Sequence, residues 1–179
     1  MTDEQIMEAV KVGEVHKASL LFDRYHKRIY HFLTRLAMDR EMAEDLTQNV
    51  FVRVIRYRQS YRQGLKVQAW IFQIARNVFA DHYHQQKNRK SEWIDITKMS
   101  DQVADAEEGR VQEEQEKLLE RSMAKLSDEQ RELLVLTRFQ HMKYEEVAAI
   151  MDTTVANIKV KVHRAIARLR EHYFELEKS

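Results

Sequence analysis

The chain has 179 residues, and its 30 Lys and Arg nearly balance its 29 Asp and Glu, so bulk charge identifies no class of partner. It contains no cysteine, which excludes disulfide frameworks, thiolate zinc sites and cysteine redox sensing. It also lacks a run of about 18 apolar residues and an apolar signal-peptide segment, so we expect a cytoplasmic protein. Three Gly and no Pro leave few helix breakers, and the sequence therefore predicts an all-α fold.

Three amphipathic helices are predicted in the first half of the chain. Between residues 18 and 38 the apolar residues recur at gaps of three and four and form one helix face, namely Leu21, Phe22, Tyr25, Ile29, Phe32, Leu33 and Leu36. A second helix is expected to begin at Asp39, a good N-cap, and its stripe is Ala43, Leu46, Val50, Phe51, Val54 and Ile55. A short loop over residues 60–68 contains Gly64, and the helix beyond it carries Trp70, Ile71, Ile74, Val78 and Phe79.

The composition changes over residues 91–111, where the apolar period fades and six acidic residues stand against two basic ones. This segment is expected to be a flexible acidic linker. It divides the chain into a first helical domain, residues 1–90, and a second helical domain, residues 112–179.

The second domain shows the pattern of a helix-turn-helix. Ser127 and Gln130 form a predicted capping box at the start of one helix. The stretch "YEEVAAIM" predicts the next helix, the three residues "DTT" form a turn, and a strongly basic helix follows. Two helices joined by a short turn, with a basic second helix, are typical of a module that reads duplex DNA in the major groove.

A second basic region lies in the first domain. Nine basic residues and a single acid, Asp81, occupy residues 52–90, so this segment carries about eight positive charges. Aromatic residues alternate with these charges, and aromatic rings can stack on unpaired bases. The pattern favours single-stranded or melted DNA, although Trp70 and Phe79 are each also compatible with a purely structural role in the core.

The order and spacing of three motifs resemble a bacterial sigma factor of the extracytoplasmic-function (ECF) group in the sigma-70 family. "AEDLTQNVFVRVIR" resembles the helix that binds RNA polymerase core, "VQAWIFQIARNVFADHYHQQKNR" resembles the helix that opens and reads the −10 element, and "LSDEQRELLVLTRF" through "HRAIARLR" resembles the domain that reads the −35 element. The resemblance implies a region 2 helical bundle, a region 4 helix-turn-helix, and no metal or small-molecule cofactor.

The resemblance implies roles for individual positions. Asp45, Gln48 and Phe51 fall in the helix that binds the clamp helices of the polymerase's largest subunit. The alternative for Asp45 is an ordinary surface acid near a helix start. The implied −10 contacts include the loop that captures a flipped base and comprise Tyr61, Arg62, Gly64, Lys66, Trp70, Arg76, Asn77, Lys87, Arg89 and Lys90. On residues alone, Gly64 could also be an ordinary turn glycine.

The implied −35 contacts are Thr154, Asn157, Lys159, Val160, Lys161, His163 and Arg164. Lys or Arg can donate to guanine, and Asn can pair with adenine, while Arg168 and Arg170 could contact phosphates or only solvent. Thr153 or Thr154 is expected to cap the recognition helix. Asp152 replaces the usual turn glycine, and Val160 stands where the family often has a hydrogen-bonding Ser.

The function that follows is promoter-specific initiation, with RNA polymerase core, promoter DNA and an anti-sigma protein, often membrane-bound, as partners and with no small-molecule substrate. An operator-binding helix-turn-helix regulator is the main alternative, but it does not need the basic, aromatic segment of the first domain. An enzyme is disfavoured, since no phosphate loop or nucleophile elbow is present. His82 and His84, two residues apart on one helix, point in divergent directions.

Overall fold

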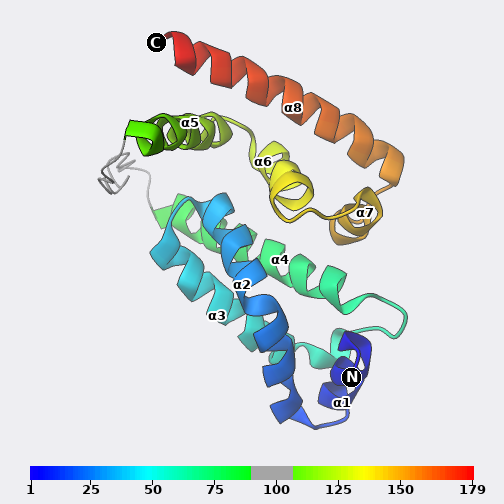
Figure 1. Cartoon of the computed structure of the whole chain (residues 1–179). Helices are drawn as coiled ribbons and strands as arrows, with labels where there is room; N and C mark the ends of the chain where they lie inside the picture. Colours follow the sequence, from blue (N-terminus) through cyan, green and yellow to red (C-terminus); the bar gives the residue numbers. More distant parts are fainter. Residues whose placement is uncertain (90–106) are drawn as a thin grey trace.

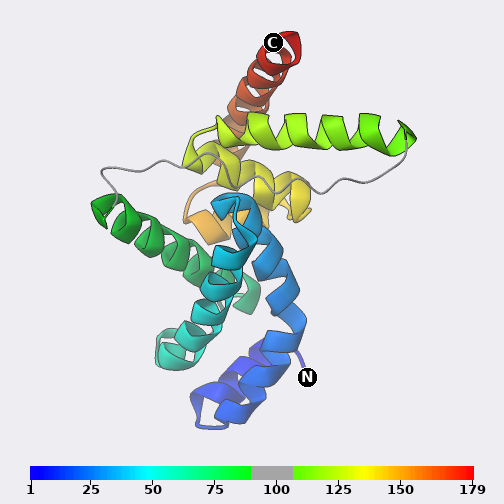
Figure 2. The ribbon, with the colours of Figure 1, turned by 90° about the vertical axis from the view of Figure 1, so that its left-hand side faces the viewer.

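The computed structural model describes residues 1–89 and 107–179, and all regular structure in these ranges is helical, in agreement with the predicted all-α class. The N-terminal group contains α1 (Asp3–Lys11), α2 (Ala18–Ala37), α3 (Arg40–Arg56) and α4 (Val67–Arg89), with 3-10 turns at Val15–Lys17 and Arg58–Ser60. The C-terminal group contains α5 (Glu107–Ala124), α6 (Asp128–Leu134), a π-helical turn at Val135–Phe139, α7 (Tyr144–Met151) and α8 (Val155–Lys178). Figures 1 and 2 show the C-terminal group stacked above the N-terminal one.

The N-terminal group is held by the apolar faces of α2, α3 and α4. Phe32 of α2 and Phe72 of α4 are fully buried and meet edge to face, with 5.4 Å between ring centroids. Asp39 caps α3 as predicted, because its side chain accepts a hydrogen bond from the Met42 amide at 3.1 Å. Two positions of the predicted stripes are wrong, since Phe22 and Ile55 are 40% and 37% exposed. The apolar stripes of α2 and α3 are wider than the faces that neighbouring helices cover, so residues at the edges of the stripes stay exposed.

The sequence did not predict α1, which packs beneath the other N-terminal helices (Figure 1). Thr2 and Gln5 form a capping box at its start, and Ile6, Met7 and Val10 are fully buried. A nine-residue helix offers only about two turns of periodicity, so its apolar pattern does not stand out in a charged segment.

The C-terminal group contains the predicted helix-turn-helix. Ser127 accepts a hydrogen bond from the Gln130 amide at 3.2 Å, and the Gln130 side chain accepts one from the Ser127 amide, so the capping box is confirmed. Asp152 ends α7 in the left-handed region with φ +52°, a conformation that Asp tolerates better than most residues. Thr154 caps α8, the recognition helix. Residues 107–111 of the predicted linker belong to α5, and residues 91–106 lie outside the described part.

The two groups are packed against one another through polar contacts. Arg131 of α6 donates to the Leu36 carbonyl at 3.3 Å, and Gln140, just beyond the π-helical turn, donates to the Arg28 carbonyl at 3.3 Å. The guanidinium of Arg35 lies 3.8 Å from the centroid of the Phe139 ring, a cation–π contact. The described part of the chain is therefore closed, with the C-terminal group resting on α2 and α4.

Candidate functional site

The predicted polymerase-binding helix, α3, presents its polar residues to solvent. Asp45 and Gln48 are exposed, and Asp45 lies at the edge of a hollow of about 340 Å³ between α3 and α4. Phe51 is only 9% exposed and packs edge to face on Phe22, with 5.0 Å between ring centroids. Phe51 is therefore not part of the exposed surface of α3, and it supports that surface through its packing in the core.

Two exposed apolar residues extend the same face of α3. Val52 is 52% exposed and Ile55 is 37% exposed, at spacings of four and seven from Gln48 that place all three along one side of the helix. Neither exposure was predicted from the sequence, because Ile55 falls in the apolar stripe expected to face the core and Val52 lies outside that stripe. An exposed apolar strip beside an acid and an amide is a surface suited to another protein.

In the loop between Ser60 and Val67, one residue points into the core and the basic residues lie in solvent. Tyr61 is 1% exposed, and its hydroxyl donates to the Leu65 carbonyl at 2.6 Å. Arg62, Gly64 and Lys66 are exposed, and Gly64 has φ +93°, which favours glycine. The loop therefore offers basic side chains and open backbone to solvent, while its tyrosine ring stays inside.

The predicted aromatic platform is mostly core. Trp70 is 7% exposed and lies edge to face on Tyr61 at 5.4 Å between centroids. In the closed chain neither ring presents a free face on which an unpaired base could stack, because both are enclosed by the fold. Phe79 is half-buried and stacks on the exposed ring of Tyr83 at 6.2 Å.

Arg76 of α4 is engaged by the C-terminal group. Its Nε forms an ion pair with Glu132 of α6, and its Nη1 donates to the Ile150 carbonyl at 3.2 Å. Burial raises the pKa of Glu132 above its ordinary value, although Arg76 lowers it in part. The next predicted residue, Asn77, is exposed. The side chains of Lys87 and Arg89, and the whole of Lys90, lie outside the described residues.

The recognition helix α8 displays its predicted contacts outward. Lys159, Val160, His163 and Arg164 are all exposed. The Asn157 amide donates to the Thr153 hydroxyl at 2.7 Å and is partly buried, while Lys161 forms an ion pair with Glu129 of α6. Beyond them, Arg168 pairs with Glu171 at 2.8 Å, and Arg170 is exposed.

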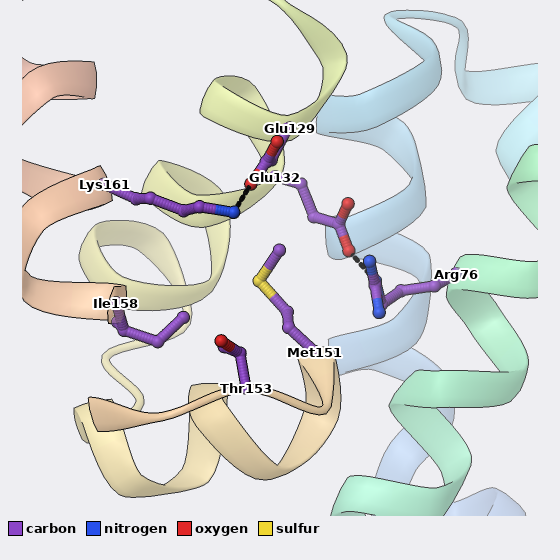
Figure 3. A pocket seen from close by; sticks show the side chains of 7 residues that line it. All are labelled: Arg76, Glu129, Glu132, Met151, Thr153, Ile158 and Lys161. Carbon is purple, nitrogen blue, oxygen red and sulfur yellow. Dashed lines mark hydrogen bonds and ion pairs between the residues drawn. The ribbon is translucent and has the colours of Figure 1, made fainter. Parts of the chain in front are cut away.

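Figure 3 shows that Arg76 and Lys161 approach α6 from opposite sides. Glu129 and Glu132, three residues apart on α6, each hold one of these basic side chains beside a cavity of about 280 Å³. A spacing of three places both acids on one helix face. The sequence could not indicate this arrangement, because the Arg76–Glu132 pair joins residues from different domains.

Within the described ranges 1–89 and 107–179, no three His, Asp or Glu side chains gather as metal ligands. None of the helices in those ranges is long and apolar enough to cross a lipid bilayer.

Comparisons with known proteins place both halves of the chain. The family Sigma-70 region 2 matches residues 21–89, and Sigma-70, region 4 matches residues 116–169. The chain is 32% identical over 158 residues to the ECF RNA polymerase sigma factor SigM of Bacillus subtilis, covering 86% of this chain and 93% of SigM. It is 24% identical to the ECF RNA polymerase sigma-E factor of Escherichia coli, covering 92% and 91% of the two chains.

Two solved structures share the fold. CnrH, in complex with the cytosolic domain of CnrY, matches with a TM-score of 0.70 at 19% identity over 94% of this chain and 95% of that one. RpoE of Bartonella quintana, in complex with the anti-sigma factor NepR, matches with a TM-score of 0.67 at 23% identity over 86% and 94%. The protein belongs to the extracytoplasmic-function group of the sigma-70 family, whose members bind RNA polymerase core and direct promoter-specific initiation of transcription.

Proposed function

We propose that the chain divides its work between two domains, residues 1–90 and 112–179, joined by the acidic segment 91–111. The first domain would bind polymerase core and trap unpaired −10 bases, and the second would read the −35 duplex, both in the cytoplasm. The observation that carries this division is that each domain holds its own exposed polar surface, one on α3 and the 61–66 loop and the other on α8.

The polymerase contact is assigned to the exposed face of α3. Asp45 and Gln48 would meet basic and amide groups on the clamp helices of the largest subunit, and Val52 and Ile55 would bury apolar area beside them. Phe51 would keep the helix surface in place through its packing on Phe22. A mixed apolar and polar patch of this kind suits a specific protein interface.

The −10 contact is assigned to the outward side of the loop and the helix that follows it. Arg62, Lys66 and Asn77 are exposed and supply hydrogen-bond donors, while the backbone at Gly64 allows a base to approach closely. Tyr61 and Trp70 would contribute by supporting the loop from inside. Lys87, Arg89 and Lys90 are proposed to hold the phosphate backbone, and Arg76 would join them after release from Glu132.

The −35 contact is assigned to the first half of α8. Lys159 and Arg164 would donate to guanine or phosphate, and Val160 would touch a thymine methyl group. Asn157 and Lys161 would need to exchange their internal partners, Thr153 and Glu129, for DNA. Thr154 would fix the start of the helix, and His163 completes the proposed set.

An anti-sigma protein is proposed as a regulatory partner. CnrH and RpoE were each solved with a second protein, in the latter case an anti-sigma factor. In this chain, the exposed strip of α3 and the outer face of α8 are surfaces that such a protein would have to cover in order to block both polymerase and DNA. This anti-sigma protein would be bound to the membrane.

The test is a run-off transcription assay with bacterial core polymerase, on a promoter selected from random −35 and −10 sequences. Asp45→Ala/Gln48→Ala should abolish core binding, whereas Glu177→Ala, which removes an exposed acid near the end of α8, should not. Lys159→Ala/Lys161→Ala/Arg164→Ala should retain core binding but lose initiation. The control Lys117→Ala/Arg121→Ala on α5 should retain both. Tight duplex binding by the wild-type chain without core binding would contradict the assignment and favour an operator-binding regulator.

A further inference from the structure

The N-terminal helix α1 lies outside the matched family region, which begins at residue 21. It is nevertheless firmly built into the first domain. Ile6, Met7 and Val10 are fully buried, and Asp3 forms hydrogen bonds with both the hydroxyl of Tyr25 and the guanidinium of Arg24 on α2. Burial and the bond to Asp3 raise the pKa of Tyr25, so the phenol stays neutral and donates. The helix therefore has a fixed position relative to α2.

Two hydrogen bonds that run in opposite directions tie the far end of α1 to Tyr61, the first residue of the 61–66 loop, and to Gln59 in the 3-10 turn before it. The Lys11 ammonium donates to the Tyr61 carbonyl at 2.8 Å, a contact between residues fifty positions apart. The Gln59 amide in turn donates to the Lys11 carbonyl at 2.7 Å. A charged donor on a partly buried carbonyl is among the stronger hydrogen bonds in proteins. One residue of α1 thus fixes the chain on both sides of Ser60.

Beyond this tie, the loop is braced internally. The Tyr61 hydroxyl donates across the loop to the Leu65 carbonyl, and the Leu65 amide donates to the Arg62 carbonyl at 3.2 Å. Burial raises the pKa of the Tyr61 hydroxyl, and the negative charges of Glu4 and Glu8 on α1 raise it further. The position of the Tyr61 backbone therefore sets the position of the exposed residues that follow it.

We propose that α1 positions the base-capturing loop, with Lys11 as the positioning residue that fixes the Tyr61 carbonyl. Lys11 itself does not touch DNA in this account. It holds the loop so that Arg62, Gly64 and Lys66 meet an unpaired −10 base in one geometry, which is what discrimination among bases requires. This inference rests on the proposed −10 role of the loop.

The experiment uses holoenzyme assembled from the full chain and core polymerase. Transcription is measured on four promoters that differ only in the −10 base the loop captures, and again on a set varied only at −35. Lys11→Met should reduce discrimination among the four bases by about five- to tenfold, since one charge-assisted hydrogen bond is lost. Discrimination at −35 should not change. Lys11→Arg, which keeps a charged donor, should restore most of the −10 discrimination.

Two controls separate positioning from simple destabilisation. Lys17→Met removes a nearby lysine that pairs with Glu14, and it should leave base discrimination unchanged. Gln59→Met removes the hydrogen bond from the Gln59 amide to the Lys11 carbonyl without changing Lys11 itself. It should therefore reduce −10 base discrimination in the same way, even if Lys11→Met folds poorly. Equal loss of activity on all four promoters, or wild-type discrimination in both variants, would overturn the proposal. A wild-type holoenzyme indifferent to the −10 base would instead contradict the proposed function of the loop.

Discussion

In the C-terminal half, Lys159, Val160 and Arg164 project from α8 into solvent, whereas in the N-terminal half Arg76 is turned towards Glu132 of the other domain. The aromatic residues differ in the same way. Tyr61 and Trp70 of the first half are enclosed by its core, and only the loop residues between Tyr61 and Val67 remain outward. Most of the duplex-reading surface is thus displayed in the closed chain, with Asn157 and Lys161 as the exceptions, while Arg76 of the surface for melted DNA is engaged by the other domain.

The difference follows from how each surface is made. The recognition helix is formed by residues close together in the sequence, since Asp152 forms the turn before it and Thr154 caps it. One apolar stripe packs this helix on its domain, and the opposite face is therefore left towards solvent. The −10 surface combines a loop, a helix flank and a neighbouring helix, so it depends on contacts between distant segments. Its state can therefore be changed by packing of the second domain.

The largest effect is expected for Trp70, if its ring is structural. Trp70→Ala should lower the free energy of unfolding by about 3–5 kcal/mol, because it leaves a cavity against Tyr61. Tyr83→Ala, which removes a 45% exposed ring from the same helix, should change it by less than about 1 kcal/mol. Chemical denaturation of the full chain measures both. Near-equal stabilities of the two variants would mean that the Trp70 ring is not needed for the core and is free to stack on a base.

The next effect concerns α8. Lys159→Ala/Arg164→Ala should weaken holoenzyme binding to a double-stranded −35 fragment roughly 100-fold and reduce the salt slope by about two, as expected for two lost DNA contacts. Arg76→Ala, measured with promoter DNA that includes the −10 element, should cost less than about tenfold. Arg76 must leave Glu132 to reach DNA, so its net contribution is smaller. Equal losses of DNA affinity in the two variants would contradict the conclusion that Arg76 is less available to DNA than the residues of α8.

The sequence predicted the local features of both halves well. The caps at Asp39 and Ser127, the turn at Asp152 and the helix class depend on neighbouring residues, and the structure confirms them. Asp45 and Gln48 on α3 and Lys159 and Arg164 on α8 are exposed, and their contacts stay predictions. What the sequence did not predict depends on distant contacts: the burial of Tyr61, the tie from Lys11, and the pairing of Arg76 with Glu132. Local periodicity cannot indicate which segments meet in space.

A charge reversal at α6 should open the closed chain. Glu132→Arg places two guanidinium groups against one another, and the closed population should fall about tenfold because like charges in a partly buried contact repel strongly. Since the chain has no native cysteine, Ser19→Cys and Ser179→Cys allow specific labelling for a fluorescence distance measurement. The double variant Arg76→Glu/Glu132→Arg should restore closure.

The control for this reversal is Glu145→Arg, which changes the charge at an exposed position of α7. It should leave the distance between the labels unchanged. If Glu132→Arg gave the same distance as the unmodified chain, the ion pair would have no part in holding the domains together. The polar contacts at Leu36 and Arg28 would then account for closure.

The smallest effect is a dependence of closure on pH. Burial raises the pKa of Glu132, Arg76 partly offsets this, and Asp128 and Glu129 on the same helix raise it further; Lys161 lines the same cavity. In an open chain Glu132 would titrate nearer its ordinary value, so the closed form binds the proton at higher pH. Closure should therefore be strongest below the ordinary pKa of a glutamate, weaken as pH rises through the raised pKa, and change no further above it.

The change in the closed population as pH is lowered from neutral towards the ordinary pKa of a glutamate is read from the same pair of labels. Glu132→Gln should remain closed throughout, because its amide can still accept from Arg76, and it should remove the pH dependence. Loosening of the wild-type chain on acidification would instead mean that the attraction between Arg76 and ionised Glu132 exceeds the cost of burying the carboxylate. The N-terminal half would then be held by charge, and not merely by packing, in contrast to the free surface of α8.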